Sequence, residues 1–116
     1  MEFERRVKER IKAIPKGQVA TYAQIAALAG NHRGARQVAR VLHSSSDKDE
    51  LPWHRVINSR GGISLPKGRG FEEQKRLLTK EGVDVGRRGR VDLDTYRWPA
   101  GQGPSRGARE FLKGLK

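Results

Sequence analysis

The feature that most constrains the fold is a pair of short helical patterns joined by a tight turn. Residues 22–29 have helical spacing, and Thr21 with Gln24 three residues later has the form of a capping box. A glycine ends this segment, and residues 31–34 connect it to a second helical pattern over 35–43. Two short helices, the second rich in arginine, are typical of a helix-turn-helix. The pattern alone does not separate a DNA-binding unit from a helical hairpin that binds nothing.

Periodicity elsewhere predicts two further helices and several short strands. Apolar spacing predicts helices over 2–14 and 71–82. In the helix over 35–43 we expect four residues to face inward: Ala35, Val38, Ala39 and Leu42. Strands are expected as a hairpin of Val56-Ile57 with Ile63-Ser64 around the turn 59–62, and at 83–85 and 91–93 around the basic turn Arg87-Arg88-Gly89-Arg90. The fold class is therefore mainly α with short strands.

The length of the chain limits it to one modest core. With 116 residues, 34% of them hydrophobic, we expect a single domain over residues 1–99. Residues 100–116 contain glycine, proline and basic residues, and we expect a mobile tail with a marginal helix at 108–115. No apolar run has the length of a membrane span, and the first residues lack a signal-peptide core. An intracellular protein is expected, in the cytoplasm or nucleoid of a bacterium or in the nucleus of a eukaryote.

Positive charge dominates the chain and is unevenly placed. Lys and Arg number 25 against 13 Asp and Glu, a net charge of +12. No acidic residue occurs between Arg10 and Asp47, or from Leu51 to Phe71. Long stretches without carboxylates favour a surface that binds phosphates, although a generally basic protein is the alternative.

The chain has no cysteine, which excludes disulfides, cysteine metal ligands and a thiol nucleophile. The three histidines lack partners at the spacing of metal ligands, and there is no phosphate-binding loop of the Walker type. We therefore predict no catalytic residue, no metal and no cofactor.

Three motifs in order identify a family resemblance. The segments Ile14–Tyr22, Ala35-Arg36-Gln37-Val38 and Pro52-Trp53-His54-Arg55-Val56 together resemble the O6-alkylguanine-DNA alkyltransferase family, in its C-terminal DNA-binding domain. In that family the third motif is Pro-Cys-His-Arg-Val, and the cysteine takes the alkyl group from the lesion. Here Trp53 stands at that position, as in the alkyltransferase-like proteins. The resemblance covers residues 3–98 and implies a winged helix-turn-helix-like fold.

The resemblance also implies a function without alkyl transfer. Indole atoms do not accept an alkyl group by in-line displacement as a thiolate does. An aromatic wall can instead pack against an alkylated base. We therefore expect a monomeric, non-enzymatic damage sensor that binds O6-alkylguanine in double-stranded DNA by nucleotide flipping. Its further partners would be nucleotide excision repair proteins. The alternative interpretation of Trp53 is a core tryptophan, which Pro52 before it and His54-Arg55 after it make less natural.

Individual roles follow from the motif positions. Arg36 matches the arginine that enters the base stack, and Tyr22 the tyrosine that helps rotate the nucleotide outward. By position alone, further DNA contacts are assigned to Thr21, Arg33, Gln37 and Arg40. The lesion pocket is assigned to Trp53, Tyr22, Pro52, Ser64 and Lys67, with Arg69 as the alternative source of a cation. A supporting network is assigned to His54, Arg55, Glu81 and Asn58.

Two other functions fit parts of the sequence. A winged helix-turn-helix transcription factor would read unmodified DNA, and it would normally be a dimer. Residual alkyltransferase or glycosylase activity would need a nucleophile or a positioned carboxylate. Asp47, Asp49 and Glu50 are near the pocket in sequence, but their segment is expected to be solvated.

Overall fold

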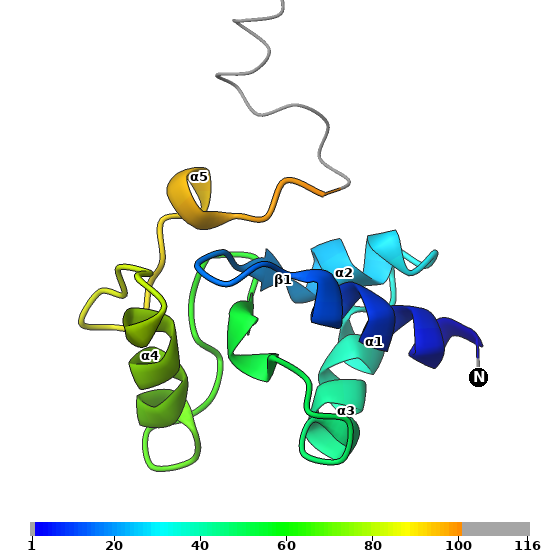
Figure 1. Cartoon of the computed structure of the whole chain (residues 1–116), viewed down its shortest axis with the longest axis horizontal. Helices are drawn as coiled ribbons and strands as arrows, with labels where there is room; N and C mark the ends of the chain where they lie inside the picture. The colour runs from blue at the N-terminus through cyan, green and yellow to red at the C-terminus, as the bar shows by residue number, and fades with distance from the viewer. Residues whose placement is uncertain (1, 101–116) are drawn as a thin grey trace, which may run out of the picture.

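The computed structural model describes residues 2–100, and the tail with its expected helix lies outside them, apart from Ala100. In chain order the elements are α1 (Glu2–Ala13), β1 (Ala20–Thr21), α2 (Tyr22–Leu28), α3 (Ala35–Ser45), the 3-10 helix η1 (Trp53–Arg55), β2 (Val56–Ile57), α4 (Phe71–Lys80) and α5 (Leu93–Tyr96). Figure 1 shows α1, α2 and α3 together on one side and α4 with α5 on the other. The predicted class, mainly helical with short strands, is confirmed. Among the described residues, no helix has the length and apolar character needed to cross a membrane.

The first three helices form much as the sequence predicts. Gln24 N donates to Thr21 Oγ1 at 3.0 Å and Thr21 N donates to Gln24 Oε1 at 3.4 Å, so the capping box starts α2. α2 packs against both α1 and α3. α3 continues to Ser45, beyond the expected end, and Ser45 is buried. The prediction that Ala39 faces inward is wrong: it is exposed, because Val38, Val41 and Leu42 define the buried face.

The strand pairing differs from the sequence prediction. Val56 and Ile57 do form a strand, but β2 pairs in parallel with β1 instead of returning to Ile63 and Ser64. The expected tight turn exists, since Asn58 N donates to Gly62 O at 3.0 Å. After that turn, however, Ile63 N donates to Gly89 O at 2.9 Å. A distant segment thus takes the hydrogen bond that a local hairpin needs, and the crossover through α2 and α3 supplies the parallel partner.

The expected strands around the basic turn are reduced to one bridge. Val85 and Val91 pair antiparallel, but Leu93 begins α5 instead of ending a strand. Asp92 explains the difference, because its carboxylate accepts hydrogen bonds from Asp94 N at 3.0 Å and Thr95 Oγ1 at 2.8 Å. A capping aspartate favours a helix start over a continued strand.

Two apolar clusters lie on either side of the strand pair. The helical core comprises Val7, Ile11, Ile14, Ala20, Ile25, Ala26, Ala29, Val38, Val41, Leu42, Leu51 and Val56. The turn core comprises Val19, Ile57, Leu78, Val83 and Val91. Successive strand residues point to opposite faces, so Val56 enters the first cluster and Ile57 the second. The strand pair therefore joins the two halves of the domain.

Candidate nucleic-acid interface

A cleft of about 650 Å³ opens where the two halves meet. Its walls come from the start of α2, the exposed side of α3, η1, the loop before α4 and α4 itself. The lining residues are Tyr22, Ala39, Leu42, His43, Ser44, Ser46, Asp47, Trp53, Ser64, Leu65, Arg69, Gly70 and Gln74. The exposed Ala39 adds only a methyl group to the α3 side of the cleft, so it takes up little of the space there.

Trp53 belongs to both the cleft and the core. Its half-buried ring packs against the helical core and also lines the cleft. Its ring meets that of His54 edge to face, with centroids 6.2 Å apart. Trp53 N donates to Leu51 O at 2.7 Å, which fixes the start of η1. The indole is thus anchored by the core and still presents surface to the cleft.

Two hydroxyl groups meet at the cleft. Tyr22 Oη lies 3.1 Å from Ser64 Oγ, within hydrogen-bonding distance, although the residues are far apart in sequence. Arg69 also lines the cleft. Pro52 and Lys67 are not lining residues: Pro52 is the cap residue of η1, and Lys67 is exposed in the turn that Arg69 N closes on Pro66 O. Of the two cations considered from the sequence, Arg69 is therefore the one beside the cleft.

The outer face of α3 is basic. Arg36, Gln37 and Arg40 are exposed on the helix, and Arg33 is exposed in the turn before it. Within residues 2–100 none of these three arginines forms an ion pair with a carboxylate. Thr21 differs from them, because its side chain is buried in the capping box. The three arginines are available to an anion, whereas the Thr21 hydroxyl serves the fold.

Behind Trp53, Glu81 joins three parts of the chain. Its carboxylate accepts two hydrogen bonds from Arg55, at 2.9 Å from Nε and 2.6 Å from Nη2, and lies 2.9 Å from His54 Nε2. Arg55 Nη1 also donates to Ile14 O at 2.9 Å. Burial alone would raise the pKa of Glu81, but the hydrogen bonds from Arg55 and His54 outweigh it and lower that pKa to about 2. The network holds the 3-10 helix in place as a charged clamp.

Two amides complete the support of this segment. The buried Gln74 donates from Nε2 to His54 O at 3.1 Å and to Val56 O at 3.0 Å. Asn58 Oδ1 accepts from Arg60 N and Gly62 N, both at 3.0 Å, so this side chain closes the turn after β2. The segment that follows Trp53 is thus held by the side chains of Glu81, Gln74 and Asn58.

Sequence reasoning missed several lining residues. His43 lies at the expected end of α3, and Ser44, Ser46 and Asp47 join it at the cleft because α3 continues to Ser45. Leu65 and Gln74 reach it from the second half of the domain. Among these residues, only the serine run at the end of α3 is a local sequence signal, and its composition favours a flexible loop over a cleft wall. Within residues 2–100 no group of three metal-binding side chains comes together.

A helix-turn-helix with an exposed basic helix beside a cleft defines a DNA-binding class of protein. The family model for the 6-O-methylguanine DNA methyltransferase, DNA binding domain, matches residues 2–83, and the chain belongs to this family. It is 47% identical over 96 residues to the DNA base-flipping protein of Escherichia coli K12, covering 83% of this chain and 74% of that protein. These comparisons confirm the family predicted from the three motifs.

The alkyltransferase-like branch of the family is also represented. The chain is 37% identical over 102 residues to Alkyltransferase-like protein 1 of Schizosaccharomyces pombe, covering 84% of this chain and 94% of that protein. A crystal structure of S. pombe Atl1 with damaged DNA containing O6-carboxymethylguanine matches with a TM-score of 0.76, over 84% of this chain and 94% of that one. The fold and the predicted kinship with alkyltransferase-like proteins are therefore confirmed.

Proposed function

We propose that this protein recognises O6-alkylguanine in duplex DNA by turning the damaged nucleotide into the cleft beside Trp53. The observation that carries this proposal is the position of the indole, which forms one wall of a cleft of about 650 Å³ next to the basic face of α3. Extrusion of a base costs a few kcal/mol, which contacts in the cleft must offset. The name of the E. coli relative and the damaged DNA bound to S. pombe Atl1 support the same activity.

The protein leaves the alkyl group on the base. Transfer in this family's chemistry needs a thiolate, and the chain contains no cysteine. An indole face adds stacking and apolar contact, both of which favour a base that carries an extra alkyl group. His54 and Arg55 are engaged by Glu81, which gives them a role in holding the wall.

The remaining contacts divide between the duplex and the gap left in it. Arg36 enters the base stack, where its planar guanidinium can stack and donate hydrogen bonds to the orphaned partner base. Arg33, Gln37 and Arg40 contact phosphates and position α3. Tyr22 steers the rotating nucleotide at the cleft, where Ser64 orients its hydroxyl.

The complex marks the lesion for nucleotide excision repair. A bound but chemically intact lesion still has to be removed by another system. A protein that flips the base and stays bound presents that system with an altered duplex. The family resemblance implies this step, in which the partners would be nucleotide excision repair proteins.

Binding to two matched duplexes tests the function. Fluorescence anisotropy at one stated salt concentration should show tighter binding to a duplex with O6-methylguanine than to the same duplex with guanine. Trp53→Ala should abolish most of the difference, whereas Trp53→Phe should retain part of it through stacking. Equal affinity of the wild type for both duplexes would refute the proposal.

Two further readouts separate the alternatives. Mass spectrometry after incubation should show neither alkylated protein nor a released base, and either product would indicate an enzyme. Selection from random duplexes should return no sharp motif. A motif bound without regard to alkylation would indicate a transcription factor.

A further inference from the structure

Four arginines outside the cleft lie on two turns that are hydrogen-bonded to each other. Arg60 lies in the turn after β2, and Arg87, Arg88 and Arg90 lie in the basic turn before α5. All four are exposed, and within residues 2–100 none forms an ion pair with a carboxylate. The proposed lesion contacts use none of them. We call these four residues the turn arginines.

Backbone hydrogen bonds lock the two turns together. Val91 N donates to Gly61 O at 2.7 Å, and Ile63 N donates to Gly89 O at 2.9 Å. Gly61 has a φ of 83°, and a Cβ there would lie 2.5 Å from Val91 O. This approach of backbone to backbone is open only to glycine. The backbone under Arg60 and Arg90 is therefore fixed by the fold.

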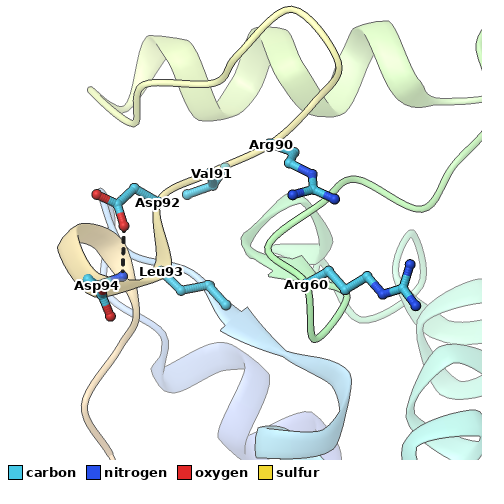
Figure 2. Close-up of a pocket in the computed structure, with 6 residues that line it drawn as sticks. All are labelled: Arg60, Arg90, Val91, Asp92, Leu93 and Asp94. Carbon is cyan, nitrogen blue, oxygen red and sulfur yellow. Dashed lines mark hydrogen bonds between the residues drawn. The ribbon is translucent and has the colours of Figure 1, made fainter.

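Among the described residues, the acidic residues nearby form no ion pair with these arginines. A pocket of about 340 Å³ lies between Arg60, Arg90 and the start of α5. Figure 2 shows the side chains of Arg60 and Arg90 pointing to one side, with Asp92 and Asp94 on the other. The carboxylate of Asp92 already accepts two hydrogen bonds as the cap of α5. The guanidinium groups are left facing outward.

The turn arginines are also close to the cleft. Ser64, which lines the cleft, is four residues after Arg60, so the two Cα atoms are separated by at most about 14 Å. Ile63, the neighbour of Ser64, donates a backbone hydrogen bond to Gly89 O, in the turn that contains Arg88 and Arg90. Duplex DNA carries one negative charge for about every 1.7 Å of its axis. Phosphates of a duplex seated at the cleft thus come within reach of the turn arginines.

We propose that the turn arginines form a second phosphate-binding surface, which holds the same duplex outside the segment contacted by α3. The inference rests on the proposed function in one respect, that the duplex is seated at the cleft. Arg60 and Arg90 line one pocket, and Arg87 and Arg88 lie in the same basic turn as Arg90. Like charges on two joined turns repel each other, and a polyanion relieves this repulsion. Guanidinium groups also suit phosphate because they donate two parallel hydrogen bonds.

The salt dependence of binding tests this surface. The variant R60Q/R90Q, with R87Q/R88Q as a second pair, is compared with the wild type on a long duplex over a range of salt concentrations. Removing one arginine that neutralises a phosphate should reduce the slope of log affinity against log salt by about 0.9. At least one pair should reduce it by about 1–2 and weaken binding at least about fivefold at low salt. Unchanged slopes in both pairs would overturn the proposal.

A matched control and a shortened duplex exclude a general charge effect. R10Q/K12Q removes two exposed charges from α1, a helix that does not line the cleft and does not carry the turn arginines. This variant should keep the wild-type slope. Shortening the duplex on one side of the lesion should weaken the wild type but not the turn variants, so the two changes are non-additive. Full additivity on both sides, or an equal loss in the control, would contradict a local contact.

The outcome is separable from that of the lesion test. The turn arginines do not line the cleft, so the ratio of affinities for O6-methylguanine and guanine duplexes should be the same in the turn variants as in the wild type. Reduced slopes in the turn variants, with no lesion preference in the wild type, would support this surface while refuting the proposed function. A lesion preference in the wild type, with unchanged slopes in the turn variants, would support the proposed function while refuting this surface. Circular dichroism and thermal unfolding are the controls that check whether the variants are folded.

Discussion

The two halves of the domain are stabilised in different ways. In the helical half, amphipathic helices bury one face each, and Val7, Ile11 and Val38 are fully buried. In the second half, backbone hydrogen bonds join turns that are distant in sequence, and a smaller apolar cluster centres on Ile57 and Leu78. Local periodicity builds the first half, whereas contacts between distant residues build the second.

The cleft beside Trp53 is built from both halves. Tyr22 and α3 come from the helical half, and Ser64 and Arg69 come from the second. Trp53 lies between them, with its ring on the helical core and its neighbours tied to Glu81 and α4. The proposed lesion-binding wall at this junction stays in position only while the two halves remain joined.

Leu78→Ala should have the largest effect, because it removes a fully buried side chain from the smaller core. We expect the free energy of unfolding to fall by about 2–5 kcal/mol. Leu77→Ala, at a half-buried position on the same helix, is the control and should cost much less. Urea denaturation should show one transition in both variants. Two transitions would mean that the halves fold separately.

Glu81→Gln should be next, since it leaves Arg55 and His54 without their anionic partner. We expect a loss of about 2–3 kcal/mol at neutral pH. The folded pKa of Glu81, about 2, lies below its ordinary value of 4.5. The stabilisation is therefore present above pH 4.5 and is lost as the pH falls toward 2. Urea denaturation from pH 7 to 2 should show the two proteins converging in acid, and a constant difference would contradict the charged clamp.

Gly61→Ala tests the close approach of the two turns. The alanine would be strained at a φ of 83° and would press its Cβ on Val91 O. Gly68→Ala is a matched control, because Gly68 has a φ of 79° with nothing near its Cβ position. We expect thermal unfolding to show a loss about 1–2 kcal/mol greater for Gly61→Ala than for the control. Equal losses would show that the approach contributes little.

Thr21→Ala should have the smallest effect, because it removes one cap from the helical half. The loss should be about 1 kcal/mol, the usual value for a helix cap. Thr79→Ala, at an exposed position of α4, should leave the midpoint of thermal unfolding nearly unchanged. A loss as large as that of Leu78→Ala would show that Thr21 supports more than the start of α2.

The sequence predicted the helical half better than the second half. The capping box at Thr21 and Gln24 and the helices around it depend on residues within a few positions of each other. The Val56-Ile57 strand was also found, but its partner was not, because local order gives no sign that Ala20 and Thr21 lie beside it. Of the residues assigned to the lesion pocket from the sequence, Trp53, Tyr22 and Ser64 line the cleft, whereas Pro52 and Lys67 do not.

The amino-acid sequence alone determined the family, the helix-turn-helix and the absence of a cysteine thiol. These follow from residue types and short spacings. Only the tertiary structure decided that Asp47 and Gln74 reach the cleft, that Glu81 clamps Arg55, and that two arginine-bearing turns form one surface. The physical reason is that these contacts join residues far apart in the chain, and their geometry exists only after both cores have packed.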